Sequence, residues 1–152
     1  MNPRLVWAAL VLATVATWAS AQTPGPTLEP SSWLGLTPGP AYQNRGAPAE
    51  VFPLAIDDKH WQVVHFYTDH TYLYWTGNHV WQVRLDKLWT GSLGGVTMGM
   101  ARDAAEAVLG APAAKGDTWS VWALPYATFP QKLRLVFTDG VVADAYVYRS
   151  DL

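Results

Sequence analysis

The chain has 152 residues, half of them hydrophobic, and a net charge of −2 at pH 7. This length is enough for one domain with a sizeable core. The weak negative charge argues against a nucleic-acid partner, which requires a strongly basic surface. The chain contains no cysteine, which excludes disulfides and thiolate chemistry, so packing must stabilise the fold.

Residues 1–21 are typical of a secretory signal peptide. Arg4 gives a positive start, residues 5–19 are almost wholly apolar, and Ala19-Ser20-Ala21 is a signal-peptidase pattern. We expect cleavage before Gln22, which would leave a periplasmic or secreted protein with no transmembrane segment and, without cysteine, no lipid anchor. The alternative is an uncleaved anchor, although a run of about 15 residues is short for a bilayer-spanning helix.

Residues 22–32 are rich in proline, threonine and glycine, which predicts a flexible leader. In the segment that follows, Pro38 and Pro40 interrupt a helical pattern. We therefore expect no more than a turn or so of helix, over residues 41–45, before Gly46.

Alternating apolar residues predict four strands, over residues 50–56, 60–67, 71–76 and 79–85. The first is expected to be a short edge strand, because Pro53 interrupts it. Gly77-Asn78 predicts a two-residue hairpin turn. Such a turn would pair Trp75 with Val80, Tyr74 with Trp81, Leu73 with Gln82 and Tyr72 with Val83.

The glycine-rich residues 91–95 predict a linker. Residues 101–109 are strong helix formers with a narrow apolar stripe, and Gly110 and Pro112 are expected to end that helix. Asp139-Gly140 predicts a second hairpin turn. Three strands are expected around it, over residues 118–124, 133–138 and 141–148.

The two halves of the chain repeat one pattern. Leu34-Gly35-Leu36 and Met98-Gly99-Met100 are each followed, eleven residues after the glycine, by Gly-Ala-Pro. Matching blocks also occur at residues 61–63 and 119–121, and at residues 73–80 and 135–142. Four matched blocks in one order indicate a duplicated unit of about 55 to 60 residues. We place the first repeat at residues 33–90 and the second at residues 91–152.

The second repeat resembles the SmpA/OmlA (BamE-type) outer-membrane assembly domain. The matching motifs are Gly99-Met100 before the helix, Leu-Gly-Ala-Pro at residues 109–112, the aromatic strand of Trp119 and the hairpin motif at residues 137–142. In layout, the tandem copies are similar to the β-lactamase-inhibitor-protein group, in which a concave aromatic sheet face grips a partner protein. The resemblance implies an α+β fold of two tandem helix-plus-antiparallel-sheet repeats, a two-layer sandwich. Whether the two sheets merge stays open.

Large rings on the first hairpin have the composition of an interface. Rigid aromatic side chains and arginine dominate binding hot spots, because they bury much area at little entropic cost. Three interpretations stay open: rings that fill the core, a protein interface, or a surface that stacks on glycans. The candidate binding residues are Tyr72, Tyr74, Trp81, Gln82, Arg84 and Trp89.

His65, Asp69 and His70 are weak candidates for a metal site, which His60 and His79 could complete. Their spacing matches no known metal motif, and no catalytic or phosphate-binding motif is present, so we expect no cofactor and no enzyme activity. We predict an exported, non-enzymatic protein that binds or scaffolds another protein of the cell envelope. The alternatives are a glycan-binding module and, less favoured, a metal-dependent enzyme.

Overall fold

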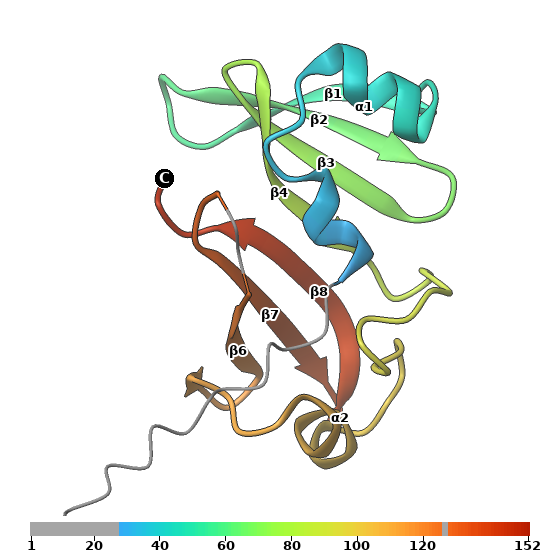
Figure 1. The fold of residues 1–152 in the computed structure, drawn as a ribbon, viewed down its shortest axis with the longest axis vertical. Coiled ribbons are helices and arrows are strands. Elements are labelled where there is room, and N and C mark those ends of the chain that lie inside the picture. Colours follow the sequence, from blue (N-terminus) through green and yellow to red (C-terminus); the bar gives the residue numbers. More distant parts are fainter. Residues whose placement is uncertain (1–27, 126–127) are drawn as a thin grey trace, which may run out of the picture.

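The computed structural model describes residues 28–125 and 128–152. Within these residues the chain forms two α-helices, one short 3-10 helix and a single eight-stranded antiparallel sheet, as Figure 1 shows. The expected α+β class is therefore confirmed. The expected signal peptide and residues 22–27 of the expected leader lie outside the described residues.

The helices and strands follow one another in the order η1, α1, β1 to β4, α2, β5 to β8. The helical segments are η1 (Glu29–Trp33), α1 (Pro38–Arg45) and α2 (Arg102–Leu109). The first four strands are β1 (Glu50–Ala55), β2 (Trp61–Tyr67), β3 (Thr71–Thr76) and β4 (His79–Leu85). The last four are β5 (Ala114–Lys115), β6 (Trp119–Leu124), β7 (Gln131–Thr138) and β8 (Val141–Arg149).

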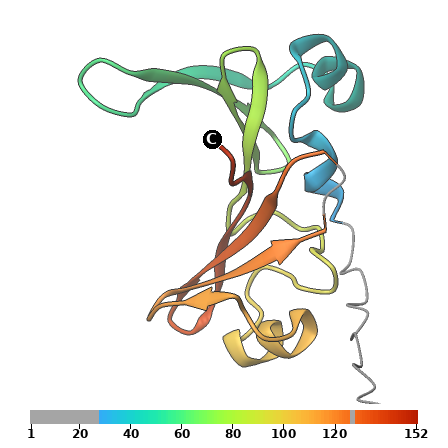
Figure 2. The same ribbon diagram turned by 60° about the vertical axis from the view of Figure 1, so that its left-hand side comes forward.

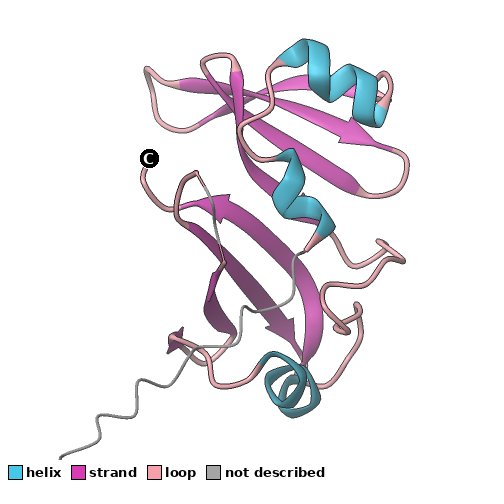
Figure 3. Cartoon of the chain, in the orientation of Figure 1, coloured by secondary structure: helices cyan, strands magenta, loops and turns pink. Residues whose placement is uncertain are grey.

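The strands lie in the order β1-β2-β3-β4-β8-β7-β6-β5, so the two halves of the chain share one sheet. The joint is the antiparallel pair of β4 and β8, in which Gln82 lies opposite Tyr148 and Leu85 opposite Ala145. Figure 3 shows these two strands side by side in the middle of the molecule. β1 and β5 are left at the two edges.

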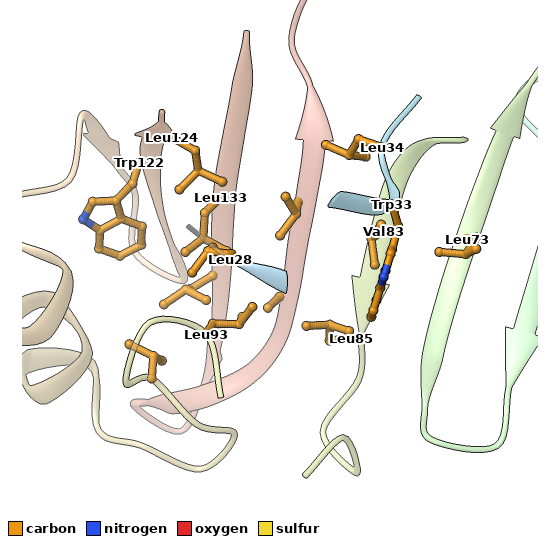
Figure 4. Close-up of a cluster of buried hydrophobic side chains, with 14 of the residues drawn as sticks. Leu28, Trp33, Leu34, Leu73, Val83, Leu85, Leu93, Trp122, Leu124 and Leu133 are labelled. Carbon is orange, nitrogen blue, oxygen red and sulfur yellow. The ribbon is translucent and has the colours of Figure 1, made fainter. Parts of the chain in front are cut away.

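The hydrophobic core lies on one side of the sheet. Alternation along each strand sends every second side chain to that side, and η1, α1 and α2 cover it, as Figure 2 shows. Core side chains come from both halves, including Leu73 and Val83 from the first half and Leu133 and Trp122 from the second (Figure 4). The other side of the sheet carries no helix among the described residues.

The end of the expected flexible leader is instead part of the core. Leu28 is 2% exposed and Trp33, the last residue of η1, is 6% exposed. η1 contacts both β4 and β8, and in Figure 4 its flanking residues Leu28 and Leu34 lie over the middle of the sheet. This segment is ordered rather than flexible because the apolar side chains that lie among its prolines bury apolar surface at the joint between the two halves.

Helix α1 is longer than expected. It begins at Pro38 and spans eight residues, as many as α2. Pro38 and Pro40 do not break it because they lie in the first turn, where backbone N–H groups lack an intrahelical partner and proline costs little. Gly46 ends the helix with a φ of 75°, a left-handed conformation that glycine adopts without strain.

The expected strands are confirmed, and β3 and β4 have the expected bounds. Their expected pairing is right only at Trp75, which lies opposite Val80. A β-bulge follows, because Trp81 is an extra residue, so the remaining pairs shift by one position. The observed pairs are Tyr74 with Gln82, Leu73 with Val83 and Tyr72 with Arg84.

No helix in residues 28–125 or 128–152 has the length and apolar character that crossing a bilayer requires.

Candidate binding face

The side of the sheet opposite the helices forms a candidate binding face, which we call the helix-free face. On β3 Leu73, Tyr74 and Trp75 are all buried, whereas on β4, β7 and β8 the buried residues largely alternate with half-buried or exposed ones. Because successive side chains of a strand point to opposite faces, the second set lies on the helix-free face. With their partners on β2 and β6 and with the buried Tyr74, which lies opposite Gln82, the large and charged residues of this face are Phe66, Tyr72, Tyr74, Trp81, Gln82, Arg84, Trp119, Lys132, Arg134, Asp144, Tyr146 and Tyr148.

One row of this face crosses five adjacent strands from β2 to β7. Phe66 lies opposite Tyr72, Tyr72 opposite Arg84, Arg84 opposite Tyr146, and Tyr146 opposite Arg134. The guanidinium carbon of Arg84 lies 5.1 Å from the Tyr72 ring centroid and 6.0 Å from that of Tyr146. From Tyr72 to Arg134, rings and cations therefore alternate along the row, and Arg84 lies within the range of cation–π attraction of both neighbouring rings.

Arg84 is held by a carboxylate on the neighbouring strand. Its Nε donates to Asp144 Oδ1 at 2.7 Å, and its Nη2 lies 2.6 Å from the same oxygen. Burial alone would lower the pKa of Arg84, but the hydrogen bond and charge of Asp144 outweigh it and raise that pKa above its usual value. This ion pair joins β4 to β8 and neutralises the charge of Arg84.

Arg134 differs from Arg84 because it is exposed and makes no ion pair with the described residues. Its guanidinium carbon lies 5.5 Å from the centroid of the Trp119 ring. It lines two shallow hollows of the helix-free face, of about 420 Å³ and about 300 Å³. The larger hollow is also lined by Trp81, Gln82, Tyr146 and Tyr148, and the smaller one by Trp119, Val121 and Tyr148.

The Tyr72 end of the row is fixed by a small polar cluster. The Tyr72 hydroxyl donates to Asp86 Oδ2 at 3.0 Å, and His70 Nδ1 lies 3.1 Å from the same oxygen. Burial raises the pKa of Asp86, but bonds from the Leu88 N–H, from His70 and from Tyr72 outweigh it, so that pKa lies below its usual value. The ionised carboxylate therefore orients the Tyr72 ring.

The weak metal candidates are not brought together. His65 lies on the helix side, with its ring centroid 4.8 Å from that of Trp75. Asp69 is bound by Arg45, whose Nη2 lies 2.8 Å from Oδ2, and His70 is bound to Asp86. In the part of the chain that the structure describes, no group of three or more metal-ligating side chains converges.

A third hollow, of about 310 Å³, lies beside the end of α1 and is lined by Arg45, Tyr67 and Asp69 among others. Arg45 is occupied there, because its guanidinium carbon lies 4.2 Å from the Trp33 ring and 4.7 Å from the Tyr67 ring. Stacked between two rings and paired with Asp69, this arginine holds α1 to the sheet. Its contacts are those of a structural residue.

No family model matches the chain, and neither a curated protein nor a solved structure matches it. The inference of function therefore depends on the residues themselves.

Five of the six candidate binding residues lie together on the helix-free face, from Tyr72 on β3 to Arg84 on β4. Tyr74 is 8% exposed, and burial raises its pKa, so this ring fills space beneath the face. Trp89 does not lie on the face: it follows β4 and packs against the core. Its place in a loop, outside the alternation of a strand, explains why it lies apart from the other five candidates.

The sequence analysis missed the contribution of the second half of the chain. Trp119, Arg134, Tyr146 and Tyr148 lie on the same face as the predicted residues. The signal was present in β8, where Tyr146 and Tyr148 alternate with the buried Ala145 and Val147. That alternation indicates residues of the helix-free face only once β8 is known to pair with β4.

Proposed function

We propose that this chain is an exported, non-enzymatic module that binds or scaffolds another protein of the cell envelope through its helix-free face. The observation that carries the proposal is the continuous row of rings and arginines across five strands. Aromatic rings bury a large area on binding and lose little conformational entropy, and arginine is enriched beside them at binding hot spots. In this face they are also held by ion pairs and cation–π contacts, which reduces the entropic cost further.

The face is continuous because β4 pairs with β8, and we infer that this pairing arises from a duplicated unit. Local backbone geometry supports the inference. Gly35 donates to the Val80 carbonyl at 2.7 Å, and Gly99 donates to the Val142 carbonyl at 2.8 Å. Both glycines have a φ of 79°. In each half the valine N–H donates back, to Leu36 at 3.0 Å or to Met100 at 2.9 Å.

The β-bulges supply independent support for the duplication. The register shifts between Tyr74 and Trp75 in the first half, and between Val136 and Phe137 in the second. Both positions fall inside the matched sequence blocks 73–80 and 135–142, at the same place in each. The resemblance to BamE-type domains, and to the tandem layout of β-lactamase inhibitor proteins, is part of this proposal. In the latter group a concave aromatic sheet face grips a partner protein.

A glycan ligand is the second candidate, and the larger hollow favours it. Three rings, Trp81, Tyr146 and Tyr148, line this hollow with the amide of Gln82. Trp81 Nε1 donates to Gln62 Oε1 at 3.0 Å, which fixes the plane of its ring. Sugars stack on such rings and bond to such amides. The protein partner is preferred because the row of rings and arginines extends well beyond this hollow.

The test is capture of envelope proteins by the full chain, expressed with a C-terminal tag. Detergent extracts of the cell envelope are passed over wild-type protein, over the double variant Tyr146→Ala/Tyr148→Ala, and over Trp61→Ala. Trp61 is the matched control because it is 64% exposed and alternates with the residues of β2 on the helix-free face. Captured proteins are identified and their affinities are measured with purified components.

We expect one partner that wild type and Trp61→Ala bind equally and that the double variant binds at least tenfold more weakly. Circular dichroism and thermal unfolding check that the double variant stays folded. Loss of binding in Trp61→Ala alone would place the interface on the opposite side and contradict the proposal. Binding to purified envelope glycan that soluble sugar competes, without a protein partner, would favour the second candidate instead.

A further inference from the structure

We propose that the centre of the helix-free face binds an acidic segment of the partner protein, with an aspartate or glutamate carboxylate bound to Arg134. The inference rests on the proposed function and specifies the chemistry of the partner. It follows from the shape of the face at this point, from its charge, and from what surrounds the guanidinium group.

The two hollows adjoin across the joint of the sheet, and together we call them the groove. Arg134 and Tyr148 line both of them, so the hollows meet at these two side chains. The groove extends from Trp81 on β4, across β8 and β7, to Trp119 on β6. Its size suits an extended segment of a few residues rather than a flat surface.

The charge of the groove is positive although the chain as a whole carries −2. Arg84 is neutralised by Asp144 at the edge of the groove. Arg134 makes no ion pair with the described residues, and Lys132 is also exposed, on the same strand and two positions away. Lys132 lies opposite Tyr148 in the register of β7 and β8. Arg134 therefore lines the groove itself, and Lys132 adds a second positive charge to the same face.

A carboxylate fits Arg134 better than other acceptors do. A guanidinium group offers two parallel N–H donors that match the two oxygens of a carboxylate. The Trp119 ring, 5.5 Å away, holds the guanidinium plane by cation–π attraction. Tyr146 and Tyr148 lie beside it and would exclude water once the groove is filled, which strengthens the ion pair.

The experiment is selection of a phage-displayed library of random peptides on the full chain. We expect the selected peptides to be enriched in aspartate or glutamate next to an apolar residue. Synthetic copies of these peptides should bind at least tenfold more weakly to Arg134→Glu than to wild type. Selection on the double variant Lys132→Glu/Arg134→Glu should enrich lysine and arginine instead. Lys59→Glu is the matched control, because it makes the same charge change in the loop between β1 and β2.

Each outcome decides between the proposals. Selected peptides without acidic residues, or peptides that bind Arg134→Glu as tightly as wild type, overturn the acidic-segment proposal. If those peptides still depend on Tyr146 and Tyr148, the proposed function stands. Peptides that are insensitive to all of these variants overturn both proposals. Wild-type binding to envelope glycan that depends on Arg134 and is competed by soluble sugar would assign the groove to a glycan.

Discussion

Arg45 shows how single residues replace disulfides in this fold. Its guanidinium group donates to Asp69 at 2.8 and 3.0 Å and stacks between the rings of Trp33 and Tyr67. One side chain thereby connects η1, α1 and the turn between β2 and β3. Lysine at this position would keep the charge but lose the planar stacking between the two rings.

His65 makes the stability of the protein depend on pH. It is 9% exposed, and burial lowers its pKa, so the folded state resists protonation. As pH falls below about 6.5, the unfolded state takes up a proton that the folded state does not, and stability is lost. We expect the urea midpoint to fall more between about pH 7.5 and about pH 5.5 in wild type than in His65→Gln.

Wild type and His65→Gln share the other histidines, so the difference between their urea midpoints reports the contribution of His65 alone. An equal fall in the urea midpoint of wild type and His65→Gln would contradict this prediction.

At the scale of elements, η1 is the segment whose place in the core the sequence analysis did not predict. Trp33 packs in the core and lies 4.2 Å from the Arg45 guanidinium carbon. Trp33→Ala should lower the free energy of unfolding by about 3 to 5 kcal/mol, because it removes a large buried ring and leaves a cavity. Trp61→Ala should change it by no more than about 0.5 kcal/mol, since that ring is exposed. Chemical denaturation measures both values, and equal effects would exclude η1 from the core.

The elements that sequence analysis predicted are those with local signals. Gly77-Asn78 and Asp139-Gly140 predict the hairpins, because these residue types readily adopt the backbone angles of a two-residue turn. β5 was missed because a strand of two residues leaves no periodic pattern. The bulge at Trp81 was missed because an extra residue in a strand has no residue type of its own.

Only the residues that the first half of the chain contributes to the helix-free face could be predicted, because only they are linked by a local signal. Tyr72, Tyr74 and Arg84 belong to one hairpin, so their proximity follows from a turn of known length. Tyr146 and Arg134 reach them only through the pairing of β4 with β8. That pairing joins residues about sixty positions apart, and no local pattern specifies it.

At the scale of the whole molecule, the two halves should unfold together. Their buried side chains form one cluster that crosses the joint, and η1 contacts a strand on each side of it. We expect a single thermal transition in which the calorimetric enthalpy equals the van't Hoff enthalpy. Two transitions, or a calorimetric enthalpy well above the van't Hoff value, would show that the halves are independent units.

The single sheet leaves two free edges, and both resist growth into fibres. The Ile56 N–H donates to the His60 carbonyl at 2.8 Å, so by alternation the nitrogen of Pro53 faces away from β2 and offers no donor to an incoming strand. The opposite edge, β5, is only two residues long. Exposed Val51, Ile56 and Trp61 lie near the first edge and would otherwise invite polymerisation. We therefore expect the missing donor at Pro53 to hinder the pairing of this exposed apolar hairpin with a strand of another molecule.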